Sequence, residues 1–192
     1  MKSIVVFCGS SPGKGTKYLE IASELGQFLG KNNITLIYGG ATVGCMGAVA
    51  NGALAAGGKV IGVIPQFIQD HEIAHHGLTE LITVDSMHTR KLKMYELCDA
   101  AIALPGGFGT MDELFEMLTW QQLDLHQKPI GLLNVDGYYN GLLELLNSME
   151  KSGLLRKTDK TRLTVSHEME SLVNYLLEND SPKNDPTIFS KV

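Results

Sequence analysis

Short apolar runs that end at glycine-rich turns recur along the chain and alternate with stretches of helical periodicity. The runs show little polar alternation, which is typical of strands covered on both faces. After the first run, Leu19, Ala22, Leu25, Phe28 and Leu29 recur at helical steps. The expected strands are residues 4–7, 36–38, 60–64, 81–84, 100–104 and 130–133. Alternating strands and helices favour right-handed parallel crossovers, so we expect an α/β fold: a single-domain, Rossmann-like, doubly wound parallel sheet flanked by helices.

The domain boundary is expected close to the C-terminus. The 192 residues, 44% of them hydrophobic, fit one globular domain. A weaker strand is expected at residues 163–165, with Ser166 as the N-cap of a last helix. After Glu178 the composition has too little apolar surface to offset the entropy of ordering. We therefore expect one domain over residues 1–178 and a flexible polar tail over residues 179–192.

Charge, hydropathy and cysteine content argue against nucleic-acid-binding, membrane and disulfide-rich classes of protein. Sixteen Lys and Arg against 21 Asp and Glu give a net charge of −5, which argues against nucleic acid as a partner. The apolar run near the N-terminus is too short for a signal peptide or a membrane span, so no membrane partner is expected. The three cysteines form no C-x-x-C pair, which argues against a disulfide framework. We expect a cytoplasmic protein.

Three glycine-rich turns follow expected strands, at residues 8–11, 39–44 and 105–110. In a parallel sheet all three open on the same edge. Glycine lets backbone amides approach an anion, and the helix after the third turn adds a favourable dipole. Glycine also serves turn geometry alone, but three converging turns favour a phosphate site. A Walker A loop is disfavoured, because Cys8 and Gly15 occupy two positions that this motif fixes.

Residues 71–75 read H-E-x-x-H, the zinc-binding pattern of many metalloproteases. Such a site needs the pentad inside a well-packed helix and a third ligand further along the chain. Pro65 and Gly77 bracket the segment, and His76 is too close to be a standard third ligand. We interpret the segment as a polar, partly exposed connection and expect no metal.

Acidic residues crowd the helix that follows the third glycine-rich turn. Thr110 to Glu113 has the form of a capping box, in which Glu113 would only bond to the N-cap backbone. However, Asp112, Glu113 and Glu116 lie where phosphate is also expected, and carboxylates repel phosphate. We therefore expect one of them to face another part of the ligand.

Cations gather on an earlier expected helix, where residues 87–93 include Arg90, Lys91 and Lys93. Most such runs are solvated helical faces. His88 is more typical of a surface or capping residue than of a catalyst. Trp120 is more typical of packing, or of a partner surface, than of a cofactor site.

Residues 105–113, PGGFGTMDE, resemble the PGGxGTxxE signature of the Lonely Guy family, the cytokinin riboside 5′-monophosphate phosphoribohydrolases. The likeness covers about residues 2–178, with matching segments at 8–11, 38–40, 44–47, 61–65, 87–91 and 128–134. Binding-only relatives share the signature, so a nucleotide-binding or carrier protein without turnover is the alternative. The joint presence of Arg90 and Glu113 favours the enzyme, because a binder does not require both.

The resemblance implies hydrolysis of the N-glycosidic bond of an adenosine 5′-monophosphate, unmodified or N6-modified, which releases free base and ribose 5-phosphate. Arg90 and Glu113 match the catalytic pair. Expected substrate contacts are Glu72, Lys91, Gly106, Gly107, Phe108, Gly109, Thr110, Asp112 and Thr119. Further expected nucleotide contacts are Gly9, Ser10, Gly39, Gly40, Met87 and Glu116. No cofactor is expected, and the partners are the nucleotide and, in a homodimer with Trp120 and Leu123 at its interface, a second copy of the chain.

Two positions depart from the usual pattern of the family. Phe108 replaces a frequent tyrosine, and Asp112 replaces a frequent glutamate. These departures bear on the preferred base rather than on the reaction, so the sequence leaves a cytokinin or adenine open as the physiological product.

Overall fold

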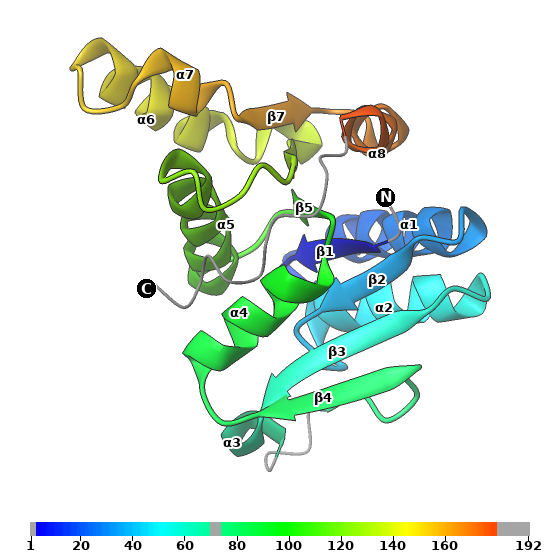
Figure 1. The fold of residues 1–192 in the computed structure, drawn as a ribbon. Coiled ribbons are helices and arrows are strands. Elements are labelled where there is room, and N and C mark those ends of the chain that lie inside the picture. The colour runs from blue at the N-terminus through cyan, green and yellow to red at the C-terminus, as the bar shows by residue number, and fades with distance from the viewer. Residues whose placement is uncertain (1–2, 70–73, 180–192) are drawn as a thin grey trace.

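A parallel β-sheet forms the centre of the computed structural model, which describes residues 3–69 and 74–179 (Figure 1). Its strands in the described ranges are β1 (Ser3–Phe7), β2 (Thr35–Tyr38), β3 (Val60–Pro65), β4 (Glu80–Val84), β5 (Ala100–Ala103), β6 (Ile130–Leu133) and β7 (Leu163–Ser166). They pair in the order β4-β3-β2-β1-β5-β6-β7. The bounds of all the predicted strands differ from these by at most one residue. The predicted fold class is confirmed.

The strand order changes direction between β1 and β5. From β1 the chain moves outward through β2, β3 and β4, and then returns to the other side of β1 for β5. Ligands of doubly wound sheets bind at such a switch point, beyond the carboxyl ends of the strands. Phe7 pairs with Ala103, so the loops that follow β1 and β5 start side by side. Gly9 N donates a hydrogen bond to Pro105 O (3.4 Å) between these two loops.

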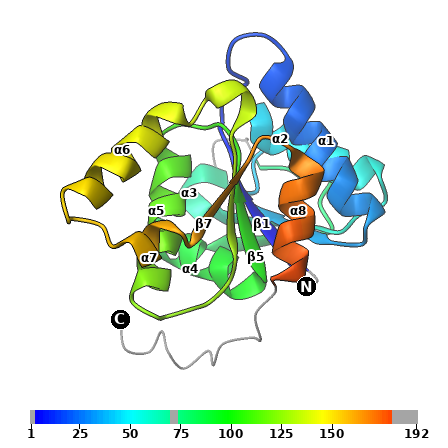
Figure 2. The ribbon, with the colours of Figure 1, turned by 90° about the horizontal axis from the view of Figure 1, so that it is seen from above.

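Helices cover both faces of the sheet (Figure 2). One face packs against α1 (Lys17–Lys31), α2 (Gly44–Ala55) and α8 (Met169–Glu178), and the other against α4 (Met87–Leu97), α5 (Phe108–Gln122) and α6 (Asn140–Lys151). The described part also contains three short helices, α3 (Gln66–Gln69), η1 (Val135–Gly137) and α7 (Lys157–Lys160). In β1, Ile4 and Val6 pack toward α1 and α2, whereas Val5 and Phe7 pack toward α4 and α5. Burial on both faces explains why the strand runs are continuously apolar.

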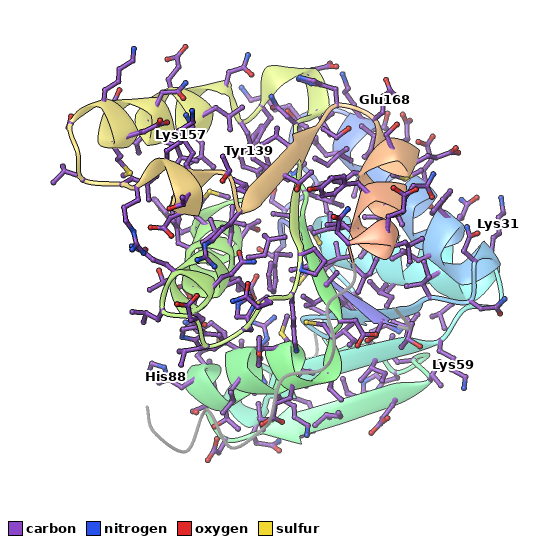
Figure 3. All side chains as sticks on the ribbon, turned by 45° about the horizontal axis from the view of Figure 1, so that its top comes forward. Lys31, Lys59, His88, Tyr139, Lys157 and Glu168 are labelled. Atoms are coloured by element: carbon purple, nitrogen blue, oxygen red, sulfur yellow. The ribbon has the colours of Figure 1, made fainter. Side chains whose placement is uncertain are left out.

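Side chains sort between this interior and the surface as their chemistry requires. Figure 3 shows Lys31, Lys59 and Lys157 projecting outward, while Tyr139 lies inside. All three cysteines are described, and all are buried free thiols. Within residues 3–69 and 74–179, no helix is both long and apolar enough to cross a membrane.

Two helix N-termini differ from the sequence prediction. Ser166 is the last residue of β7, where it pairs with Leu133, and α8 begins after Glu168. Ser166 is therefore not the N-cap; its Oγ accepts a hydrogen bond from Glu168 N (3.0 Å) just before the helix. Helix α5 begins after Gly107, so Thr110 lies inside the first turn. The capping-box interpretation of Glu113 is wrong, because the helix starts three residues too early for it.

The predicted tail begins close to the end of α8. Asn179, its first residue, is the C-cap of that helix, and its backbone N–H bonds to Tyr175 O (3.1 Å). The rest of the predicted tail, residues 180–192, lies outside the described residues, as does Glu72.

Candidate active site

A cavity of about 490 Å³ lies at the switch point of the sheet. The loops after β1, β2 and β5 form one part of its wall, and side chains from α2, α3, α4 and α5 form the rest. Its lining residues are Cys8, Gly9, Ser10, Gly39, Ala41, Val43, Met46, Phe67, Ile68, Arg90, Gly107, Phe108, Gly109, Thr110 and Glu113. All three predicted glycine-rich turns therefore meet at one cavity.

The N-terminus of α5 presents unpaired backbone donors to this cavity. The first hydrogen bond within the helix runs from Met111 N to Gly107 O (3.1 Å). The amides of Phe108, Gly109 and Thr110 therefore have no acceptor within α5, all of which is described. Thr110 is 2% exposed, and its Oγ1 has no hydrogen-bond partner among the described residues. Three amides without an acceptor in α5, a helix dipole and a buried hydroxyl without a partner among the described residues together make an anion site.

Arg90 is buried and anchored by two backbone carbonyls. Its Nε donates to Val63 O (3.1 Å) at β3, and its Nη2 donates to Gly39 O (3.2 Å) after β2. A Cβ at position 39 would lie 1.9 Å from Nη2, so any other residue there would displace the guanidinium from this place. The remaining guanidinium nitrogen, Nη1, lies 3.8 Å from Glu113 Oε1 and 3.9 Å from Met87 Sδ. Arg90 thus holds a fixed positive charge beside the carboxyl of Glu113.

Glu113 lies in the second turn of α5, and its side chain is 11% exposed. Burial raises the pKa of this carboxyl to about 7; Arg90 opposes the rise, and the charges of Asp112, Lys91 and Glu116 contribute smaller effects of both signs. Desolvation thus outweighs the attraction of the arginine. A carboxyl with this pKa changes its charge near neutral pH, which suits a group that takes part in acid–base or charge-stabilising chemistry.

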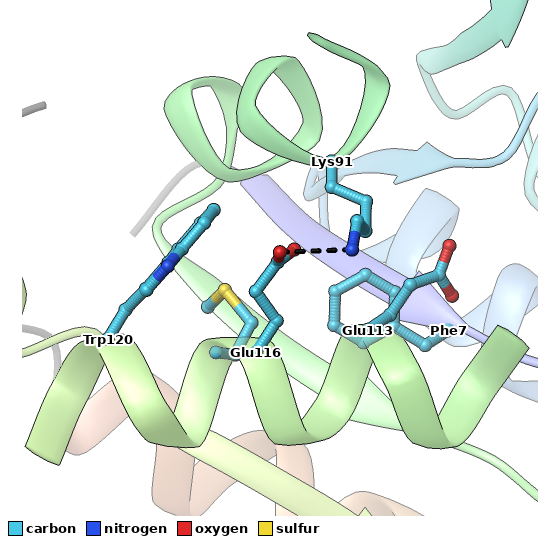
Figure 4. A pocket seen from close by; sticks show the side chains of 6 residues that line it. Phe7, Lys91, Glu113, Glu116 and Trp120 are labelled. Carbon is cyan, nitrogen blue, oxygen red and sulfur yellow. Dashed lines mark ion pairs between the residues drawn. The ribbon is translucent and has the colours of Figure 1, made fainter. Parts of the chain in front are cut away.

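Lys91, next to Arg90 in sequence, is engaged with α5 instead of the cavity. Its Nζ lies 2.9 Å from Glu116 Oε1 and 3.1 Å from Asp112 Oδ2. Burial lowers the pKa of Lys91, but the bonds to Glu116 and Asp112 outweigh it, so the net change is upward. Figure 4 shows the Lys91–Glu116 pair near Phe7 and Trp120, with the Glu113 carboxyl turned away from it. These ion pairs bridge α4 to α5 and so join the helix that carries Arg90 to the helix that carries Glu113.

Comparisons with known proteins identify the family. The family model described as "Possible lysine decarboxylase" matches residues 46–176. The cytokinin riboside 5′-monophosphate phosphoribohydrolase of Rhodococcoides fascians is 49% identical over 173 residues, which cover 90% of this chain and 87% of that protein. The phosphoribohydrolase LOG2 of Arabidopsis thaliana is 42% identical over 191 residues, which cover 100% and 89%. The chain belongs to the cytokinin riboside 5′-monophosphate phosphoribohydrolase family.

Solved structures that share the fold of this chain include proteins whose names describe carriers or cofactor binders. The Moco carrier protein from Chlamydomonas reinhardtii superposes with a TM-score of 0.70 at 19% identity, covering 100% of this chain and 99% of that one. The molybdenum cofactor binding protein from Rippkaea orientalis gives a TM-score of 0.70 at 24% identity, covering 93% and 97%. These similarities show a shared fold and carry no argument about activity.

Some of the predicted substrate contacts do not line the cavity. Thr119 is exposed on α5, and its hydroxyl donates to Phe115 O (2.7 Å). Asp112 is exposed and pairs with Lys91, while Gly40 O accepts a hydrogen bond from His75 N (2.9 Å). Within the described ranges, the predicted site residues that line the cavity are Arg90, Glu113, Gly9, Ser10, Gly39 and residues 107–110.

In the described part of the H-E-x-x-H segment, the ring of His75 is held by hydrogen bonds. His75 Nδ1 accepts from Gly77 N (3.1 Å), and Nε2 lies 3.0 Å from Asn51 Oδ1. Both ring nitrogens are thus engaged by protein groups. Among the described residues, no group of three or more His, Cys, Asp or Glu could hold a metal ion.

Sequence reasoning missed the apolar side of the cavity in this phosphoribohydrolase family member. Val43 lies within the second glycine-rich turn, Met46 lies in the first turn of α2, and Phe67 and Ile68 come from α3. Phe67 is 52% exposed and Phe108 is 96% exposed, so aromatic surface is open to a ligand. Short polar-flanked apolar segments such as residues 67–68 give no sequence signal for this placement.

Proposed function

We propose that this chain hydrolyses the N-glycosidic bond of adenosine 5′-monophosphates, unmodified or N6-modified, and releases free base and ribose 5-phosphate. The observation that supports it is the buried Arg90–Glu113 pair in the same cavity as the free amides of α5. The names of the two relatives described above support the reaction and the substrate class.

The geometry suggests how the nucleotide lies. The 5′-phosphate accepts hydrogen bonds from the amides of Phe108, Gly109 and Thr110. The ribose then lies within reach of Glu113, one turn along the same helix. As the bond from C1′ to the base breaks, positive charge builds on the ribose. An ionised Glu113 stabilises this charge and orients the water whose oxygen bonds to C1′; the water gives up a proton as this bond forms and the departing base gains one, so one water is consumed overall. Arg90 stays protonated, so its role is electrostatic and positional.

The test of this reaction is product analysis. Incubated with AMP or with isopentenyladenosine monophosphate, the protein is expected to release free base together with an equal amount of ribose 5-phosphate. A carrier of the same fold needs the phosphate site but not a buried carboxyl beside a fixed arginine. Stoichiometric nucleotide binding without any free base would favour the carrier.

The phosphate is expected to contribute much of the rate. Binding energy at the phosphate site positions the reacting ribose, so removing the phosphate should lower kcat/KM at least about a hundredfold. The measurement compares AMP with adenosine under identical conditions. Equal kcat/KM values for the two compounds would contradict the assignment of the α5 N-terminus to phosphate.

The pH dependence follows from the pKa of Glu113. Because the ionised carboxylate is the active form and the pKa is about 7, kcat/KM for AMP should rise about tenfold per pH unit below that value and level off above it. The second ionisation of the phosphate, near pH 6, adds a slope of its own, which the Glu113→Gln variant measures separately. A wild-type profile that is flat from pH 5.5 to 8 would exclude Glu113 as the titrating group.

A homodimer in the cytoplasm is part of the proposal. Leu123, at the C-terminal end of α5, is 64% exposed, and such apolar surface suits a symmetric interface. Three free cysteines suit a reducing compartment. Light scattering should give a mass near twice the 20.9 kDa of the chain. A monomer that still turns over at micromolar concentration would contradict the dimer.

A further inference from the structure

The turn after β6 lies against the loop between β5 and α5. Asp136 (φ 47°) and Gly137 (φ 73°) are both left-handed, which reverses the chain within η1. Two consecutive tyrosines follow. Their hydroxyls reach the same loop: Tyr139 Oη donates to Leu104 O (2.5 Å), and Tyr138 Oη donates to Gly106 O (2.7 Å).

Each carbonyl from Leu104 to Gly106 therefore has a donor. Pro105 O, between the two tyrosine-bound carbonyls, accepts from Gly9 N (3.4 Å). The bonds to Leu104 and Pro105 are made by a buried tyrosine and by backbone, whereas the bond to Gly106 comes from a tyrosine that is 45% exposed. Among these three carbonyls, Gly106 O is thus the one held by a half-exposed hydroxyl.

This peptide leads directly into the phosphate site. In a planar trans peptide, the carbonyl and the following N–H point in opposite directions. Gly106 and Tyr138 line a separate cavity of about 240 Å³, whereas Gly107 lines both that cavity and the larger one. With Gly106 O held toward Tyr138, Gly107 N–H points away from Tyr138, and Gly107 lines the larger cavity together with Phe108, Gly109 and Thr110.

The ring of Tyr138 is held in place independently of its hydroxyl. It packs edge-on against Tyr18 (5.8 Å between centroids) and Tyr139 (4.9 Å). An ion pair between Lys17 and Asp136 ties the start of α1 to the same turn. The hydroxyl is therefore preorganised, and its removal need not disturb the packing of the ring.

We propose that Tyr138 is a positioning residue for the 5′-phosphate: it fixes the Gly106–Gly107 peptide so that Gly107 N–H joins the amides of α5 as a phosphate donor. The proposal rests on the proposed function, since it assigns the phosphate of the nucleotide to this loop. It makes Tyr138 act through the backbone and not by contact with the reacting atoms.

The test is Tyr138→Phe, with Tyr175→Phe on α8 as the matched control, because both tyrosines are 45% exposed. Calorimetry with inorganic phosphate should show a Kd about tenfold higher for Tyr138→Phe and unchanged for the control. The kcat/KM for AMP should fall by about the same factor, while that for adenosine stays within about twofold. The melting temperature should stay close to that of the wild type.

Other outcomes separate this proposal from the reaction itself. An unchanged phosphate Kd in Tyr138→Phe, or equal losses for AMP and adenosine, would overturn the positioning role. A wild-type protein that binds no phosphate would overturn it too. If the wild type binds phosphate but releases no base, the proposed reaction fails, and the phosphate Kd of the variant alone decides the role of Tyr138. If Tyr138→Phe melts at a much lower temperature, a second variant, Tyr18→Leu, is used. It loosens the packing of the Tyr138 ring but keeps the Tyr138 hydroxyl, so it should raise the phosphate Kd by a smaller factor. An unchanged Kd in Tyr18→Leu would count against the proposal.

Discussion

Glu113→Gln is expected to lower kcat for AMP at least about a hundredfold while AMP still binds. Glutamine keeps the size of the side chain and its place beside Arg90, so the cavity and the phosphate site are preserved. It removes the negative charge that stabilises the developing positive charge on the ribose and orients the water. The effect should therefore fall on kcat rather than on KM, and steady-state kinetics with AMP measure both.

The same variant should not destabilise the protein. The folded-state pKa of Glu113 is raised, so the protonated form favours folding, and this contribution is lost as pH rises through about 7. Replacement by a neutral amide should leave the melting temperature unchanged at pH 5 and raise it at pH 8. Glu170→Gln, an exposed carboxylate in the first turn of α8, is the control and should change neither quantity. A fully active Glu113→Gln enzyme would overturn the assignment of the site.

Arg90→Ala is expected to lose both binding and rate, with kcat/KM for AMP at least about a hundredfold lower. The guanidinium is the fixed positive charge beside Glu113, and Arg90 lines the cavity. Its removal also leaves Val63 O and Gly39 O without their donor and the Glu113 carboxyl without its counter-charge. The free energy of unfolding should therefore fall by about 3 kcal/mol, measured by denaturant titration.

Two further variants separate these contributions. Arg90→Lys keeps the charge but cannot bond to both carbonyls while facing Glu113, so it should recover stability only in part and kcat/KM less. Lys93→Ala removes a partly exposed cation from the same helix, where it pairs with Glu96, and should leave kinetics unchanged. Wild-type kcat/KM in Arg90→Ala would show that the charge has no part in the reaction.

The sheet was predictable because its signals are local. Continuous apolar runs such as residues 4–7 and 130–133 report burial on both faces, and glycine-rich turns after them mark the sheet edge where ligands bind. The same reasoning brought three loops to one cavity. It failed at Ser166 and Thr110, where residue type favoured a cap but strand pairing and the early start of α5 decided the backbone.

What the sequence could not supply are contacts between distant segments. In the sequence, Arg90 is one cation among several in a basic run. Its role depends on hydrogen bonds to Val63 O and Gly39 O, which lie 27 and 51 residues away. Tyr138 bonds to a carbonyl 32 residues away, and no periodicity marks that bond. Glycine has a low helix propensity, so Gly52 in α2 looks unfavourable from the sequence. In the fold, a Cβ at this position would lie 2.2 Å from Ser23 O of α1. Such close packing depends on how helices meet, which is a property of the whole fold.

The most direct measurement is a crystal structure of the Glu113→Gln variant with AMP bound. The 5′-phosphate should accept hydrogen bonds from the amides of Phe108, Gly109 and Thr110, with the ribose C1′ next to the side chain at position 113 and the base toward the apolar wall of the cavity. This arrangement would place the scissile bond beside the carboxylate of the wild type. AMP bound in the reverse orientation, with its phosphate away from α5, or outside the cavity altogether, would contradict the account.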